Sequence, residues 1–177
     1  MFKKILVALD HSPMARFIFD QALSLAREHH TSLKLVHILS VEEETFSSTD
    51  LLYGNPIYGA PGPTIGAAVW YEQWQVFKNQ SLEQLQGFAL EANQAGVEAE
   101  CTQISGNPGK MICHLASIAG TDLILVGNRG RSGLNELLLG SVSNYVMHHA
   151  PCSVLIVKSP AKGEHSDLAN SDLAKLA

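Results

Sequence analysis

The chain has 177 residues, of which 46% are hydrophobic and 16% charged, so it can bury one core and is not a wholly disordered chain. Its net charge of −5 argues against non-specific nucleic-acid binding, which needs a basic face. No apolar run approaches the roughly 18 residues of a membrane span, and no signal peptide is expected. Three cysteines without a CxxC pair suit a reducing compartment, so we expect a cytoplasmic protein without membrane or nucleic-acid partners.

Short apolar runs alternate with helical patterns in the first part of the chain. Ile5–Leu9 is continuously apolar, as expected of a strand buried on both faces, and it ends at Asp10. Ser12 and Pro13 follow as the predicted N-cap and first residue of a helix. Leu33–Leu39 is the second predicted strand.

Residues 40–66 interrupt this alternation with a series of glycines and prolines. A structureless connection of this length is uncommon in a compact domain and is usually functional or disordered. Residues 67–95 then predict a long helix with an apolar stripe that includes Trp70, Trp74 and Phe77, and Gly96 is a plausible stop.

The second half of the chain returns to strand and helix patterns. Alternating polarity predicts an edge strand at Val97–Ile104, and an Asn-Pro pair then predicts a capped helix. The remaining predicted elements are a helix from Asn107 to about Ala119, a strand at Asp122–Val126, a glycine-containing loop at Gly127–Leu139, a short helix at Gly140–His149, a strand at Ser153–Val157 and a loose tail from Ser159.

This alternation predicts an α/β fold. Five strands form one doubly wound parallel sheet with helices on both faces, joined by right-handed crossovers. Ligands of such sheets bind outside the ends of the strands, near the switch in strand order. The residues that follow the strands are therefore candidates for a site: Asp10, Ile38, Leu39, Ser105, Gly106 and Gly127.

The strongest local pattern is Gly127-Asn128-Arg129-Gly130, then nine residues, then Gly140-Ser141. Glycines allow a close approach of the backbone to a ligand, and the N–H groups at a helix start favour an anion. A phosphate-binding loop is one interpretation. A tight strand-to-helix connection that needs glycines only to turn explains the spacing equally well.

The segment GNRGRSGLNELLLGSVSNYVMHHAPCSVLIV resembles the universal stress protein family, as do KKILVALDHSP at the start and LVHIL at 35–39. ATP-binding members of that family carry glycine, two residues, glycine, nine residues, glycine and Ser or Thr, which Gly127, Gly130, Gly140 and Ser141 match. The resemblance covers about residues 2–39 and 97–158.

The resemblance implies an adenine nucleotide alpha hydrolase-like sheet with strand order 3-2-1-4-5. It implies one universal stress protein domain at 1–158, with a long insertion at about 40–66 and a flexible tail at 159–177. The insertion could be a lid on the nucleotide or a partner-binding arm, or its aromatic side chains could pack on the long helix.

The resemblance also implies the residues of a nucleotide site. Asp10 and Gly127 would lie by the ribose, backbone groups around Ile38 would meet the adenine edge, and the glycine loop would cradle phosphates. Mg or Mn would be held mainly through the phosphates and not by side chains alone. The full implied set is Leu9, Asp10, Ile38, Gly127, Gly130, Gly140, Ser141, Val142 and Ser143.

The function implied is an ATP-binding stress-response regulator or sensor with no catalytic residue and at most slow ATP hydrolysis. The alternative is a non-catalytic homodimer that pairs through strand 153–157, in which nucleotide is incidental and residues 40–66 meet a protein partner. A flavin or dinucleotide protein is less favoured, because GxGxxG does not follow the first strand.

Two other motifs predict structural roles. Gly106-Asn107-Pro108-Gly109-Lys110 resembles a clipped P-loop, but no hydroxyl residue follows the lysine, so Asn107 is predicted to cap a helix. His37 lies in a buried strand and is predicted to be a hydrogen-bonded core histidine rather than a base.

Overall fold

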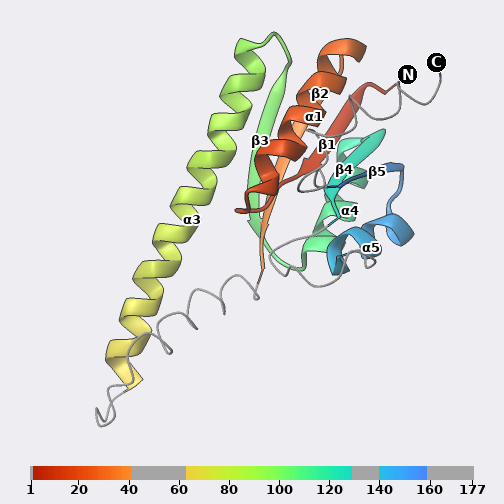
Figure 1. The fold of residues 1–177 in the computed structure, drawn as a ribbon. Helices are drawn as coiled ribbons and strands as arrows, with labels where there is room; N and C mark the ends of the chain where they lie inside the picture. The colour runs from red at the N-terminus through yellow and green to blue at the C-terminus, as the bar shows by residue number, and fades with distance from the viewer. Residues whose placement is uncertain (1, 41–62, 129–139, 159–177) are drawn as a thin grey trace, which may run out of the picture.

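The computed structural model describes residues 2–40, 63–128 and 140–158, with the backbone alone at 63–68 and 70. Strands and helices alternate along these residues (Figure 1). In chain order they are β1 (Lys4–Ala8), α1 (Met14–His29), β2 (Ser32–Leu39), α3 (Pro63–Gln94), β3 (Ala99–Ser105), α4 (Pro108–Ala119), β4 (Leu123–Gly127), α5 (Ser141–His149) and β5 (Ser153–Val157). Each predicted strand is confirmed, with its ends within two residues of the prediction.

The strands form one parallel sheet in the order β3-β2-β1-β4-β5, as predicted. Val7 of β1 lies between Leu35 of β2 and Leu125 of β4. The strand order therefore switches between β1 and β4, and the ends of these central strands meet at one edge, called here the carboxyl edge. β3 lies at one end of the sheet, which confirms the predicted edge strand.

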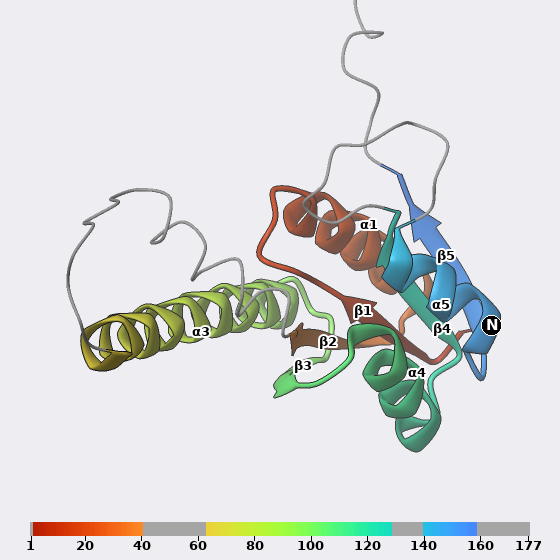
Figure 2. The same ribbon diagram turned by 90° about the horizontal axis from the view of Figure 1, so that it is seen from below.

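Helices cover both faces of the sheet (Figure 2). On one face Ile5 and Val7 pack into a core with α1 and α3, in which Phe19 stacks on Phe88 with ring centroids 4.6 Å apart. On the other face Leu6 packs with α4 and α5. Successive residues of β1 thus enter opposite cores, which explains why its sequence is a continuous apolar run rather than an alternating one.

Local capping sets where two helices start. Asn107 Oδ1 accepts a hydrogen bond from Lys110 N at 3.1 Å, which confirms the predicted cap of α4. Ser12 Oγ accepts from Met14 N at 3.2 Å, so it contributes a capping bond to α1, although the helix itself begins at Met14, one residue later than predicted.

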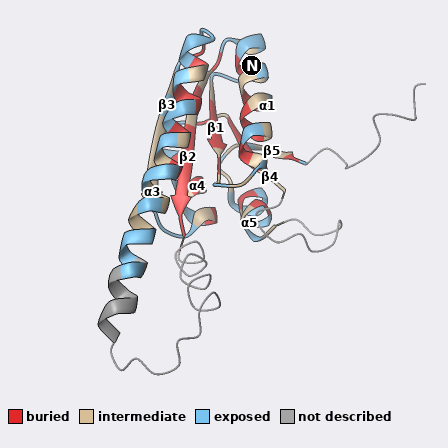
Figure 3. Ribbon diagram, turned by 60° about the vertical axis from the view of Figure 1, so that its left-hand side comes forward, coloured by how far each residue is buried: buried red, intermediate tan, exposed pale blue. Residues whose placement is uncertain are grey.

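Helix α3 begins at Pro63, so residues 63–66 are helical and the predicted loop at 40–66 is too long; residues 41–62 lie outside the described part. At 32 residues, α3 is about 48 Å long, roughly twice the length of the seven-residue β3. It projects past the carboxyl edge (Figures 1 and 3). No residue within 71–80 is buried, and the buried residues of α3 all lie from Ser81 onward, so only part of the predicted apolar stripe reaches the core. Among the described residues, no helix is both long and apolar enough to cross a membrane.

Candidate functional site

The carboxyl edge brings three of the predicted site segments together. Leu9 and Asp10 come directly after β1, Ile38 is the penultimate residue of β2, and Gly127 ends β4. Leu9 N donates to Val36 O at 2.9 Å, which continues the pairing of β1 with β2 beyond the last assigned strand residue. Because β1 lies between β2 and β4, these segments are neighbours at the switch in strand order.

The Asp10 carboxylate is held by the turn that leads into α1. Its Oδ1 accepts from Ser12 Oγ at 2.5 Å and from Ser12 N at 3.3 Å. Within the described segments, Oδ2 has no hydrogen-bond partner. One oxygen therefore fixes the side chain and the other can accept a hydrogen bond from a ligand hydroxyl.

The start of α5 is tied to the ends of β4 and β5. Asn128 N donates to Val157 O at 2.9 Å, and Gly140 N donates to Asn128 O at 2.7 Å. Ser143 is 1% exposed, and its hydroxyl donates to Gly140 O at 3.0 Å. The Ser143 hydroxyl thus stabilises the first turn of α5, which leaves its backbone N–H as the group that can face a ligand.

Among the residues that the structure describes, no side chain caps the first turn of α5. Gly140 occupies the N-cap position with φ −60° and ψ 156°, a conformation open to any residue. The turn therefore does not need glycine for its backbone conformation. A capping side chain at this position would accept from the N–H of Val142 or Ser143, whereas glycine offers no such acceptor, so these N–H groups can face an anion.

Other residues of the predicted glycine loop are not described. Gly130 and its neighbours Arg129 and Arg131 lie within 129–139, outside the described residues. Gly106, in the P-loop-like segment, has φ +153°, and a Cβ there would lie 2.8 Å from Met111 Cγ. Gly106 is therefore required by the turn between β3 and α4.

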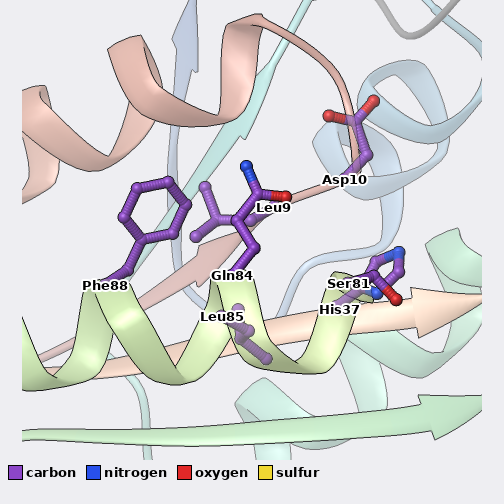
Figure 4. A pocket seen from close by; sticks show the side chains of 7 residues that line it. All are labelled: Leu9, Asp10, His37, Ser81, Gln84, Leu85 and Phe88. Atoms are coloured by element: carbon purple, nitrogen blue, oxygen red, sulfur yellow. The ribbon is translucent and has the colours of Figure 1, made fainter. Parts of the chain in front are cut away.

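A small recess opens beside Asp10, between the end of β1 and helix α3 (Figure 4). Its cavity volume is about 10 Å³, close to the minimum for one water molecule. The lining residues are Leu9, Asp10, His37, Ser81, Gln84, Leu85 and Phe88. The contributions of α3 were not predicted from the sequence, because nothing in the local pattern shows which side chains of a distant helix reach the edge.

Polar side chains hold α3 against the sheet below this recess. Gln103 Nε2 of β3 donates to Ser81 Oγ at 2.8 Å and to Lys78 O at 3.2 Å, and lies 3.3 Å from His37 Nδ1. His37 is 3% exposed. This confirms the prediction of a hydrogen-bonded core histidine.

His11 connects the loop after β1 to the same helix. Its Nδ1 lies 2.8 Å from Gln84 Oε1, and its ring meets Phe77 edge-on with centroids 5.6 Å apart. Phe77 also meets His37 edge-on at 6.3 Å. The ends of β1 and β2 are therefore both linked to the middle of α3.

The chemistry of the described residues suits binding. Burial raises the pKa of the Cys101, Cys113 and Cys152 thiols, which keeps them protonated and poorly nucleophilic at neutral pH. No group of three or more His, Cys, Asp and Glu among the described residues could hold a metal ion. A carboxylate oxygen and uncapped N–H groups remain, and these suit a ligand with hydroxyls and an anionic group.

Comparison with known proteins places the chain in one family. The model of the universal stress protein family matches residues 1–158. The chain is 46% identical to universal stress protein Slr1101 of Synechocystis sp. over 104 residues, which cover 59% of this chain and 96% of the relative. It is 37% identical to universal stress protein YxiE of Bacillus subtilis over 158 residues, which cover 89% of this chain and all of the relative.

Solved structures share the fold. Universal stress protein UspA from Lactobacillus plantarum superposes with a TM-score of 0.66 at 21% identity, covering 88% of this chain and 97% of that one. A family protein of Arabidopsis thaliana with AMP bound has a TM-score of 0.61 at 23% identity, covering 96% and 99%. A universal stress protein in complex with cAMP has a TM-score of 0.55 at 23% identity, covering 89% and 97%.

These structural likenesses agree with the strand order and with the helices on both sheet faces. The family match extends over the whole described sheet and both sides of the carboxyl edge. On these findings, the chain belongs to the universal stress protein family.

Proposed function

We propose that this chain binds an adenine nucleotide, ATP in particular, across the carboxyl edge and acts as a nucleotide-dependent stress-response regulator in the cytoplasm. The observation that carries the proposal is that the uncapped first turn of α5 lies at the same edge as the Asp10 carboxylate, of which only Oδ1 is hydrogen-bonded within the described residues, to Ser12. The AMP and cAMP bound by two structural neighbours support an adenine nucleotide as the ligand class.

Each part of the nucleotide has a proposed set of contacts. The free oxygen of Asp10, together with Gly127, meets the ribose, and backbone groups of Leu9 and Ile38 meet the adenine. Mg or Mn is held mainly through phosphate oxygens. The phosphates lie against the helix start and glycine loop at Gly130, Gly140, Ser141, Val142 and Ser143.

The proposed activity is binding rather than fast turnover. The start of α5 supplies N–H donors and Asp10 supplies one carboxylate oxygen. No residue is proposed as a nucleophile or a general base. Hydrolysis of ATP is therefore at most slow. Turnover at the roughly 1–100 per second typical of kinases would contradict this part of the proposal.

Calorimetric titration with ATP and Mg²⁺ tests the proposal in a matched pair of glycine variants. Gly140→Val keeps an accessible backbone conformation and places a branched side chain at the uncapped turn. Gly87→Val is the control, because Gly87 is exposed on α3 and a Cβ there meets nothing within 4 Å. We expect wild type and Gly87→Val to bind alike and Gly140→Val to bind at least tenfold more weakly.

Two results of that titration would reject the proposal. Absence of heat with wild type at millimolar ATP would show that the edge is not a nucleotide site. Equal affinity of Gly140→Val and wild type would show that the start of α5 does not hold phosphate, and that the glycine serves only the connection.

One observation favours a second candidate function, a dimeric interaction module in which nucleotide is incidental. β5 lies at the end of the described sheet and pairs only with β4 there. Its Leu155 side chain is 40% exposed. An apolar edge strand of this kind suits pairing with a second copy.

We also propose a single domain at 1–158, a tail at 159–177 and a protein partner at residues 40–66.

A further inference from the structure

The recess beside Asp10 is lined by both apolar and polar side chains. Leu9, Leu85 and Phe88 are buried there, as are the polar His37 and Ser81, while Asp10 and Gln84 are only half-buried. Its volume of about 10 Å³ does not admit an aromatic ring, so a planar base can only lie across the rim.

Gln84 lines this recess, and its side chain meets His11, the exposed residue that follows Asp10 in the chain. Gln84 Oε1 is an acceptor, so the contact of 2.8 Å requires that His11 Nδ1 carry the proton and donate it. In the neutral imidazole, His11 Nε2 is then an acceptor, and the Gln84 amide nitrogen is a donor. Among the described residues neither atom has another hydrogen-bond partner. Figure 4 shows the Gln84 side chain reaching from α3 toward Leu9.

The Gln84 amide donor and the His11 Nε2 acceptor together would favour adenine over guanine. Adenine carries the 6-amino donor next to the N7 acceptor, whereas guanine carries the acceptors O6 and N7 on the corresponding edge. The ribose proposed at Asp10 would bring a base to the neighbouring rim.

We propose that Gln84 and His11 determine the base specificity of the nucleotide site. The Gln84 amide donates to a ring nitrogen of adenine, and His11 Nε2 accepts from its 6-amino group. This inference rests on the proposed nucleotide function and adds two residues that come from outside the glycine loop and the strand ends.

Titrations with ATP and with inorganic tripolyphosphate separate the base contact from the phosphate contact. Gln84→Leu removes the amide at similar size, and Gln86→Leu is the matched control, because Gln86 is exposed two residues further along α3. We expect Gln84→Leu to bind ATP about 3- to 10-fold more weakly, as for one lost hydrogen bond, and to bind tripolyphosphate like wild type. Gln86→Leu should match wild type for both ligands.

A second ligand tests His11. Purine riboside triphosphate lacks the 6-amino group, so wild type should bind it severalfold more weakly than ATP. His11→Ala should bind the two ligands equally, because the acceptor that distinguishes them is gone. Non-additivity between a change in the ligand and a change in the residue is the measure of direct contact.

The outcomes distinguish this inference from the function on which it rests. If wild type binds ATP and Gln84→Leu binds it equally well, or if Gln84→Leu loses both ligands alike, the base contact is wrong and the nucleotide site stands. If His11→Ala still prefers ATP as wild type does, the contact to the 6-amino group is wrong. If wild type binds neither ATP nor tripolyphosphate, the proposed function falls as well.

Discussion

Asp122 fastens the start of β1 to the neighbouring strand β4. Its Oδ2 accepts from Lys3 N at 2.8 Å and from Lys4 N at 3.0 Å. These two backbone hydrogen bonds lower the pKa of the Asp122 carboxyl below its ordinary value of 3.8, because they favour the charged form. The side chain therefore stabilises the folded chain in its ionised state.

The pH dependence of stability follows from the direction of this pKa shift. A carboxyl with a lower pKa in the folded state than in the unfolded state contributes stability above about pH 4, and the contribution is lost as the pH falls through the depressed value. We expect Asp122→Asn to be less stable than wild type at pH 7 and the difference to narrow below pH 4. Urea unfolding at pH 7, 5 and 3 measures it, and a difference independent of pH would contradict the assignment.

Close packing between α4 and α5 positions the start of α5. A Cβ at Gly109 would lie 2.7 Å from Cδ1 of Tyr145, so the absence of a side chain lets the helices approach. Tyr145 in turn stacks on His149 with ring centroids 4.0 Å apart. The helix whose first turn is proposed to hold phosphate is thus fixed by contacts with its neighbour as well as by its tie to Asn128.

At the scale of elements, β5 ends the described sheet and exposes the apolar side chain of Leu155. We expect wild type to dimerise in sedimentation equilibrium at micromolar concentration, and Leu155→Glu to shift the population toward monomer because it places a charge on that edge. Leu90→Glu is the matched control, because Leu90 is 60% exposed on α3. A wild-type monomer at every concentration, or equal effects of the two variants, would contradict pairing through β5.

The elements themselves were largely predictable from local chemistry. β1 and β4 follow from buried apolar runs, and α4 follows from its Asn-Pro start. The start of α3 was not, since 63–66 are rich in the residues that usually mark loops. Part of the candidate site was predictable in the same way, because Asp10 and Ile38 lie at or just beyond the ends of apolar runs in the sequence.

Long-range packing explains what the sequence did not reveal. Gln84 meets His11 across 73 positions, and Gln103 meets Ser81 across 22. Such pairs depend on the register of α3 against the sheet, which neither periodicity nor spacing determines. Gly130 lies outside the described residues, so its predicted phosphate contact stays a prediction.

At the scale of the whole molecule, one topological feature organises the proposals. The switch between β1 and β4 brings the proposed ribose, base and phosphate contacts to one edge of the sheet, while two separate cores support that edge from either face. The N-terminal part of α3 projects beyond this carboxyl edge (Figure 1). The proposed nucleotide site therefore depends on the arrangement of the sheet more than on any single loop.

Amide chemical-shift mapping during titration with ATP and Mg²⁺ is the most direct test of the central claim. We predict saturable shifts concentrated at the carboxyl edge, at Asp10, Ile38, Gly127, Ser141 and Ser143. No saturable shifts would contradict the claim, as would shifts confined to the outer groove of α1 and α3 that Arg16, Asp20 and Arg27 line.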